Sequence, residues 1–176
     1  MQHKFRGVFL ANLIHLIRHL FRTGNPTIDD AVRSNFEFFN SLPGKLEIEL
    51  TEPAESYRNM ANLAAKPSAK IVNVRFHPKV FEENERKFRD LTEAELQLEI
   101  FHEPSICLRG EGGDAVEHKA PNGKSFTIKE MLTAIEATER RTRGNSEWLG
   151  GIDVHHCYFE GIYQNENRDW EIVWGS

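Results

Sequence analysis

The sequence predicts an α+β fold, with a mainly antiparallel sheet of about five to six strands and helices packed on one face. Segments with the alternating pattern of strands are interspersed with segments of helical spacing, and the strict strand–helix–strand order of a parallel sheet is absent. The length of 176 residues suits one domain, and no repeat, low-complexity tract or linker divides the chain. We therefore expect a single domain over residues 1–176, with an aromatic core because the chain contains 12 phenylalanines.

The first element is a basic amphipathic helix within residues 1–24. Between residues 5 and 22 the apolar side chains repeat at helical spacing, histidine, asparagine and arginine occupy the opposite side, and Gly24 ends the pattern. Residues 1–28 carry a charge of +4 and the whole chain −5, so the rest of the chain carries −9 and residues 25–176 form an acidic body. Packing inside the protein or at an interface is the favoured role of this helix; a membrane-surface helix and a transit peptide are the alternatives.

The next elements are predicted to be helix, strand, helix and strand. Thr27 and Asp30 have the spacing of a capping box, and an apolar stripe follows as far as Leu42. Residues 45–51 alternate between apolar and charged side chains, which is typical of a strand with one solvated face. Two further elements complete this half of the chain: an Ala-rich helix over 53–65 and a strand over 70–76.

The segment from residue 80 to residue 124 is predicted to contain one more helix and two strands. Phe81 and Phe88 lie on one side of a charged helix over 80–91. Alternation favours a strand over 95–102, although Thr92 and Glu95 also form a helix-capping pattern. A short strand over 105–110 and a loop over 110–124 follow.

The C-terminal part is predicted to be a long helix followed by a hairpin. Thr127 and Glu130 form a full capping box, and apolar residues follow at core spacing. Arg140, Arg141 and Arg143 stand at the end of this helix, where the helix dipole favours cations, and Gly144 is a suitable cap. The hairpin strands are expected at 151–163 and 170–174.

Two cysteines, Cys107 and Cys157, indicate a reducing compartment. They lie fifty residues apart, no CxxC pair exists, and two residues are too few for a secreted disulfide scaffold. Buried free thiols are the expected state. Because no stretch reaches the roughly 18 apolar residues of a membrane span, the cytoplasm is the predicted location.

The strongest candidate site is the segment Asp153–Glu160. In a strand, His155 would share one face with Asp153, and His156 would share the other with Tyr158 and Glu160. Asp153 would then fix the tautomer of His155. Tryptophans of the last strand either pack in the core or form the wall of a pocket beside this segment. The candidate ligand-binding residues are Asp153, His155, His156, Tyr158, Glu160, Trp170 and Trp174.

Metal, nucleophile and phosphate chemistry are not predicted. Adjacent histidines in a strand diverge, HExxH is absent, and further ligands would have to come from His102, Glu103, Asp114 or His118. No metal and no cofactor is therefore expected. A cysteine nucleophile would lack a base on its own face of the strand. The glycine-rich stretch 109–114 contains two acids and no phosphate-binding pattern, so it is interpreted as a flexible surface loop.

Two hypotheses of function follow. The first is a soluble binding or adaptor protein without a catalytic motif, which holds a protein partner or forms a homodimer. The alternative is a small enzyme or ligand-binding domain with a pocket centred on His155, His156 and Glu160, possibly metal-dependent, so the sequence leaves enzymatic activity undecided. A small-molecule ligand fits the alternative. The acidic body disfavours nucleic acid, and the preferred role of the N-terminal helix disfavours a membrane surface.

Overall fold

The computed structural model describes residues 27–51, 64–65, 69–145 and 152–176. The helix predicted within residues 1–24 lies outside the described residues, as does most of the helix predicted over 53–65. The described helices are α2 (Ile28–Asn40), α3 (Glu93–Leu96), α4 (Ile128–Thr142) and the 3₁₀ helix η2 (Arg143–Asn145). The described strands are β1 (Gly44–Leu50), β2 (Ala64–Ala65), β3 (Ile71–Pro78), β4 (Val80–Glu82), β5 (Lys87–Arg89), β6 (Glu99–Phe101), β7 (Ser105–Arg109), β8 (Ala115–Lys119), β9 (Phe126–Thr127), β10 (Ile152–Asp153), β11 (Tyr158–Gln164) and β12 (Trp170–Gly175).

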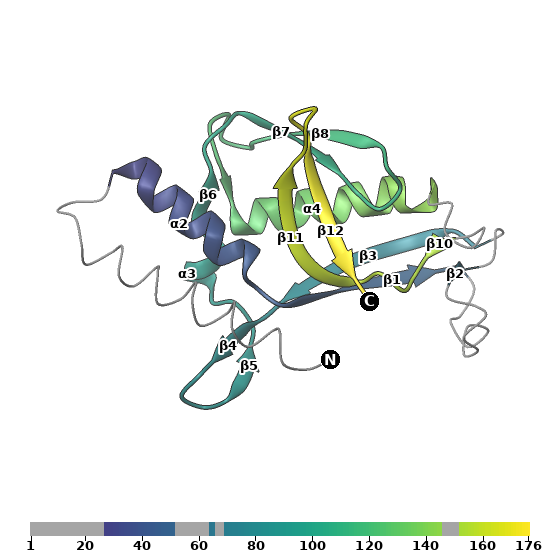
Figure 1. Ribbon diagram of the computed structural model, residues 1–176, viewed down its shortest axis with the longest axis horizontal. Helices are drawn as coiled ribbons and strands as arrows, with labels where there is room; N and C mark the ends of the chain where they lie inside the picture. The colour runs from purple at the N-terminus through teal and green to yellow at the C-terminus, as the bar shows by residue number, and fades with distance from the viewer. Residues whose placement is uncertain (1–26, 52–63, 66–68, 146–151) are drawn as a thin grey trace.

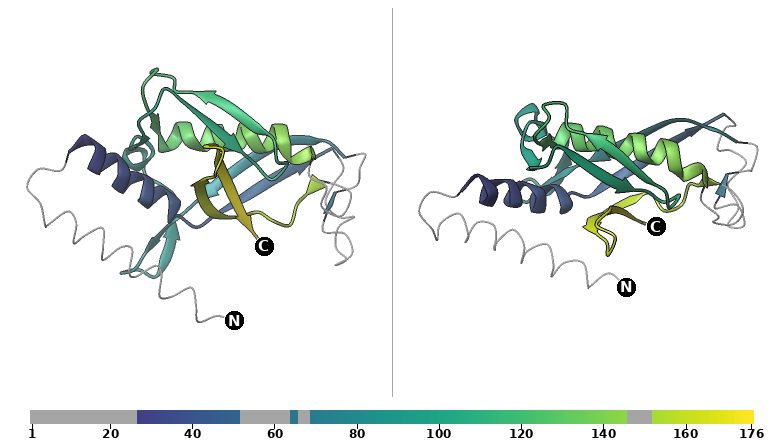
Figure 2. Two further views of the ribbon diagram at one scale, coloured as in Figure 1. Left: turned by 45° about the horizontal axis from the view of Figure 1, so that its top comes forward. Right: turned by 90° about the horizontal axis from the view of Figure 1, so that it is seen from above.

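A curled, mostly antiparallel sheet of six strands confirms the predicted α+β class. Its strand order is β3-β1-β11-β12-β7-β8, and the β12–β7 pair is parallel. The sheet bends sharply between β1 and β11, which pair at a single register position, Lys45 with Tyr158. Figures 1 and 2 show the result: the sheet curls around α4, with β3 along one side of the helix and the β7–β8 pair along another.

The two long helices begin where their capping boxes predict. The Thr27 hydroxyl accepts from the Asp30 amide at 3.2 Å at the start of α2. At the start of α4 the Thr127 amide donates to the Glu130 carboxylate at 2.7 Å. These bonds satisfy amide groups that a helix leaves without a partner in its first turn.

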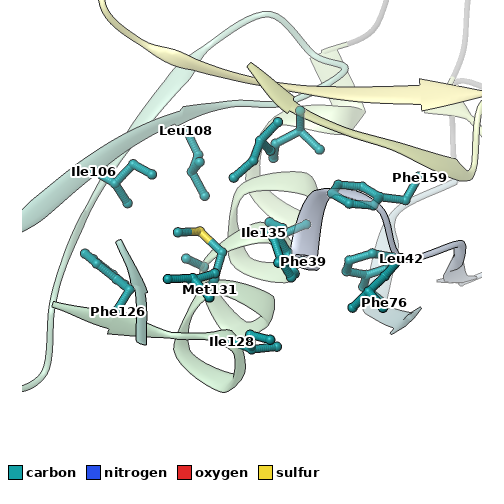
Figure 3. Close-up of a cluster of buried hydrophobic side chains, with 14 of the residues drawn as sticks. Phe39, Leu42, Phe76, Ile106, Leu108, Phe126, Ile128, Met131, Ile135 and Phe159 are labelled. Atoms are coloured by element: carbon teal, nitrogen blue, oxygen red, sulfur yellow. The ribbon is translucent and has the colours of Figure 1, made fainter. Parts of the chain in front are cut away.

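Both helices pack into one apolar cluster, which is rich in aromatic rings as predicted. Figure 3 shows Met131 and Ile135 of α4 pointing toward the same space as Phe39 of α2 and Phe159 of β11. The Phe159 ring centroid lies 5.6 Å from that of Phe39 and 4.8 Å from that of Phe76. The apolar faces of the helices and the sheet therefore bury one another, and this fixes α4 inside the curl.

The helix predicted over 80–91 is wrong: β4 and β5 form a hairpin there. Phe81 and Phe88 face each other across the ladder, with ring centroids 5.1 Å apart, which is a cross-strand pair. Arg86 in the turn has a φ of 50°, which a continuous helix does not contain. An apolar pair seven residues apart fits two turns of helix and a short hairpin equally well, so the sequence pattern did not separate them.

Three other boundaries differ from the prediction. The strand predicted over 95–102 is correct only for β6, because the capping box of Thr92 and Glu95 starts α3. The loop predicted over 110–124 contains β8, which pairs along the whole of β7. The helix predicted over 53–65 does not reach its last residues, because Ala64 and Ala65 pair with β10 as β2. In the last two cases pairing with another strand decides the conformation, the preceding strand β7 for β8 and the distant strand β10 for β2, and local propensity does not encode such pairing.

An ion pair at the start of α3 makes stability depend on pH. Both guanidinium nitrogens Nη1 and Nη2 of Arg89 donate to Glu95 at 2.7 Å. The hydrogen bond from Arg89 lowers the pKa of Glu95 to about 2 from an ordinary value of 4.5, although burial opposes it. A carboxyl with a lowered folded-state pKa stabilises the fold above its ordinary pKa and loses that contribution as the pH falls through the folded value.

We therefore expect Glu95→Gln to lower the free energy of unfolding by about 1 kcal/mol at neutral pH, a magnitude typical of a partly exposed ion pair. This difference should vanish as the pH falls from about 4.5 to about 2. Urea unfolding of both proteins across this range measures it. Glu83→Gln, at an exposed residue of the β4–β5 turn, is the control and should show no such trend. A difference that persists at pH 2 contradicts the assignment.

Candidate functional site

The two histidines lie in a turn, so the predicted strand through Asp153–Glu160 is wrong over its first half. β10 ends at Asp153, and β11 begins at Tyr158. The Oδ1 atom of Asp153 accepts the backbone amides of His155 at 2.8 Å and His156 at 3.1 Å. An aspartate that bonds the backbone two residues further on is a turn-forming arrangement that competes with a strand ladder.

This turn brings the imidazoles together instead of sending them to opposite faces. The ring centroids of His155 and His156 lie 5.2 Å apart in an edge-to-face arrangement. The predicted separation of the two rings was therefore wrong. The alternation holds at the start of β11, where Tyr158 and Glu160 are exposed and Phe159 is buried between them.

Asp153 orients the ring of His156. The sequence had predicted His155 in this role, and that prediction was wrong. Its Oδ2 atom lies 2.6 Å from Nδ1 of His156, and its side chain is fully buried. Burial alone would raise the pKa of Asp153, but the hydrogen bonds from the His156 ring and from the two backbone amides outweigh it and lower the pKa. An ionised carboxylate can only accept, so Nδ1 of His156 is the donor of this hydrogen bond.

The buried ion pair of Arg143 and Glu139 stabilises the histidine turn through hydrogen bonds to its backbone. Nη1 of Arg143 donates to the backbone carbonyls of Asp153 and His156, both at 2.9 Å. Nε of Arg143 donates to Glu139 at 2.7 Å, and both side chains of this pair are fully buried. The guanidinium carbon also lies 5.6 Å from the centroid of the Trp174 ring. Arg143, which the sequence placed among the cations at a helix C-terminus, therefore supports the histidine turn.

Glu139 connects this support to the rest of the site. Its Oε1 atom accepts from Nε1 of Trp174 at 2.8 Å and from the backbone amide of Glu111 at 3.3 Å. Each carboxylate oxygen of Glu139 thus has a donor, as a buried charge requires. Nη2 of Arg143 differs: it is buried and has no hydrogen-bond partner among the described residues.

Glu111 enters the site from the glycine-rich stretch 109–114. This stretch was predicted to be a flexible surface loop, but it packs against the end of α4. A Cβ atom on Gly112 would overlap the backbone carbonyl oxygen of Thr142, and one on Gly110 would lie 2.6 Å from Oε1 of Glu139. The absence of side chains at these two positions lets the loop lie on the end of α4. Figure 1 shows that this end of α4 and β10 lie at the same end of the molecule.

Glu111, Asp153 and His156 form one cluster. A potential ligand atom of each residue lies within 4.8 Å of the corresponding atoms of the other two. Burial raises the pKa of the half-buried Glu111, and the neighbouring carboxylates of Asp153 and Glu139 add to this, while Arg143 and His156 oppose it. Two carboxylates and one imidazole this close together can share a proton, hold a cation or bind a polar ligand.

The other candidates lie elsewhere or have structural partners. The Trp170 ring packs edge-on against Phe36 at 5.3 Å and Phe101 at 5.4 Å, and Trp174 is buried in the apolar cluster. Of the two cysteines, Cys157 is buried, as expected, and burial raises its thiol pKa, while Cys107 is half-buried.

The four residues from which a metal site would have had to take further ligands, His102, Glu103, Asp114 and His118, do not join the cluster. The hydrogen-bond partners of three of them are Glu99 for His102 at 3.0 Å, Thr138 for His118 at 2.8 Å, and Asn145 for Asp114 at 2.9 Å. Glu103 is exposed.

Sequence reasoning missed Glu111, Glu139 and Arg143 as parts of the site. A signal existed for Glu139, because it continues the buried stripe of α4 four residues after Ile135. An acid at a core position of a helix indicates a buried partner, and Arg143 stands four residues further on. No local signal marked Glu111, whose place depends on how the loop packs.

Comparison with known proteins found no matching family model, curated protein or solved structure. Within the described residues, none of the helices has the length and apolarity to cross a membrane. Fold and site together define an α+β protein with a buried Arg–Glu pair beneath an Asp–His turn.

Proposed function

We propose that this protein is a ligand-binding domain or small enzyme whose working group is the His156 imidazole. One observation carries this proposal: the fully buried Asp153 carboxylate holds Nδ1 of His156 at 2.6 Å. A carboxylate behind an imidazole fixes which ring nitrogen carries the proton, as a general base or a ligand-binding histidine requires. Glu111, in the same cluster, supplies a second polar group for a ligand.

The cost of the arrangement also supports a functional role. Asp153, Glu139 and Arg143 are charged and fully buried, although apolar side chains of similar volume are often equally stable or more stable in such positions. A fold gains little from burying three charges to shape one turn. A functional site that needs an imidazole in one fixed orientation benefits from these buried charges, because their hydrogen bonds make the support of the ring rigid.

A fragment-binding experiment tests this proposal. We expect small carboxylate- and azole-containing fragments to shift the backbone amide resonances of Glu111 and of residues 153–156 in heteronuclear NMR spectra of the full chain. His156→Gln should abolish these shifts, because it removes the oriented ring nitrogens. His102→Gln is the matched control, since His102 also contacts a carboxylate, Glu99, at 3.0 Å but lies outside the cluster. Fragments that ignore the turn, or bind His156→Gln equally well, contradict the proposal.

The second candidate is a cytoplasmic binding or adaptor protein that holds a protein partner or a second copy of itself. It is favoured by one observation: Phe81 and Phe88 are 38% and 59% exposed and lie together on the β4–β5 hairpin. Figure 1 shows this hairpin extending away from the main sheet. Exposed apolar side chains that gather on one surface often mark an interaction site. Fragments that gather at these rings and leave the histidine turn unaffected would favour this candidate.

A further inference from the structure

We propose that Glu111, Asp153 and His156 bind a divalent transition-metal ion, an inference that rests on the proposed ligand-binding role of the same cluster. The first argument is the spacing of the donors. Ligands that share one zinc-like ion at about 2.0–2.2 Å lie at most about 4.4 Å apart. The candidate atoms lie within 4.8 Å of one another, so small side-chain movements bring them near one ion. Nδ1 of His156 and Oδ2 of Asp153 are joined by a hydrogen bond of 2.6 Å, so an ion that binds both atoms has to displace the proton between them, and binding releases this proton to solvent.

The second argument is charge. The carboxylates of Glu111, Asp153 and Glu139 interact with one another and with the guanidinium of Arg143, which contacts Glu139 directly. If all three carboxylates are ionised, they exceed the guanidinium by two negative charges in a partly buried site, and the raised pKa of Glu111 reflects this crowding. Uncompensated charge in a poorly solvated region is unfavourable, and buried charges are normally paired or coordinate a metal. One divalent cation neutralises the cluster.

The third argument is independent of the acids. Nη2 of Arg143 is buried without a hydrogen-bond partner among the described residues. Buried polar atoms nearly always have a partner, and an exception indicates a water molecule or an ion that belongs there. Nη1 of the same guanidinium contacts the carbonyls of Asp153 and His156, so the unpartnered nitrogen lies beside the turn that carries two of the proposed ligands. A water or anion bound to the ion can supply its acceptor.

The donor types decide the class of ion. One imidazole with two carboxylates suits zinc, manganese, iron, cobalt or nickel, whereas magnesium and calcium prefer all-oxygen ligands. Three protein ligands leave at least one position for water or a substrate, as in catalytic zinc sites. The backbone amide of His155 donates to Oδ1 of Asp153, and the packing of the glycine loop against α4 positions Glu111. Both carboxylates are therefore oriented before an ion binds.

The test is metal titration of the full chain after removal of bound metal with a chelator. We expect Zn²⁺ to bind at one ion per chain by calorimetry, and Co²⁺ to give visible absorption bands of a site with nitrogen and oxygen ligands. Glu111→Gln and His156→Gln should each weaken Zn²⁺ binding by at least about tenfold, a factor found even for residues that only support ligands. His102→Gln should bind as wild type does.

No Zn²⁺ binding, binding unchanged in Glu111→Gln, or equal loss in His102→Gln would overturn the metal site. Glu111 is half-buried at the edge of the cluster, so its isosteric variant tests the site even if His156→Gln does not fold. The proposed function fails separately. Fragments that still bind at His156 in a protein that takes up no Zn²⁺ overturn the metal inference alone.

Discussion

Glu139→Gln is expected to lower the free energy of unfolding by about 3–5 kcal/mol, the range for removing one partner of a buried ion pair. Arg143 would keep its charge in a position that is fully buried, with no anion against its Nε atom. Trp174 and the amide of Glu111 would also share a weaker acceptor. Chemical denaturation of wild type and variant measures the loss.

Glu37→Gln is the matched control, because Glu37 is exposed on α2 and should change stability by less than about 0.5 kcal/mol. The double variant Glu139→Leu/Arg143→Leu should cost less than the two single leucine substitutions together, since no lone charge remains. If Glu139→Gln costs no more than the control, the pair does not support the fold in the way its burial indicates.

Gly112→Ala is expected to destabilise the protein by about 1–3 kcal/mol, as overpacking of a close contact does. The new Cβ would overlap the backbone carbonyl oxygen of Thr142, and backbone cannot rotate away as a flexible side chain can. The loop must therefore move off α4, and Glu111 moves with it. Thermal and denaturant unfolding measure the loss, and the amide resonances of residues 153–156 report the displacement.

Gly144→Ala is the control for this substitution. A Cβ atom there meets nothing within 4 Å, and Gly144 does not have a positive φ. Its effect should be neutral or stabilising by up to about 1 kcal/mol, because alanine reduces the freedom of the unfolded chain. Equal losses in both variants would show that the close approach of Gly112 to α4 is not the cause.

Much of the fold follows from local patterns. The capping boxes at Thr27 and Thr127 set the starts of α2 and α4, and the alternation over 45–51 predicted β1. These signals work because a cap or an alternating face depends on residues within one or two turns of each other. At Thr92 the same kind of signal was present, and it overrode the apparent alternation that followed.

The candidate site was predictable only in part. The sequence singled out the segment that contains Asp153 and His156, but it assumed a strand and therefore paired Asp153 with the wrong histidine. The two backbone bonds accepted by Asp153 turn the chain at that point. An aspartate before two histidines fits either conformation, so the outcome depended on what surrounds the turn.

By itself, the sequence determined the class of fold, the starts of the long helices, the aromatic core and the segment in which to look for chemistry. Tertiary structure alone decided that Glu111, more than forty residues away, joins that segment, and that the buried Arg143 donates to the backbone of the turn. The physical reason is that caps and alternation are short-range properties. The meeting of Glu111 with His156 requires the sheet to curl around α4 and the loop at Gly112 to pack against the end of that helix.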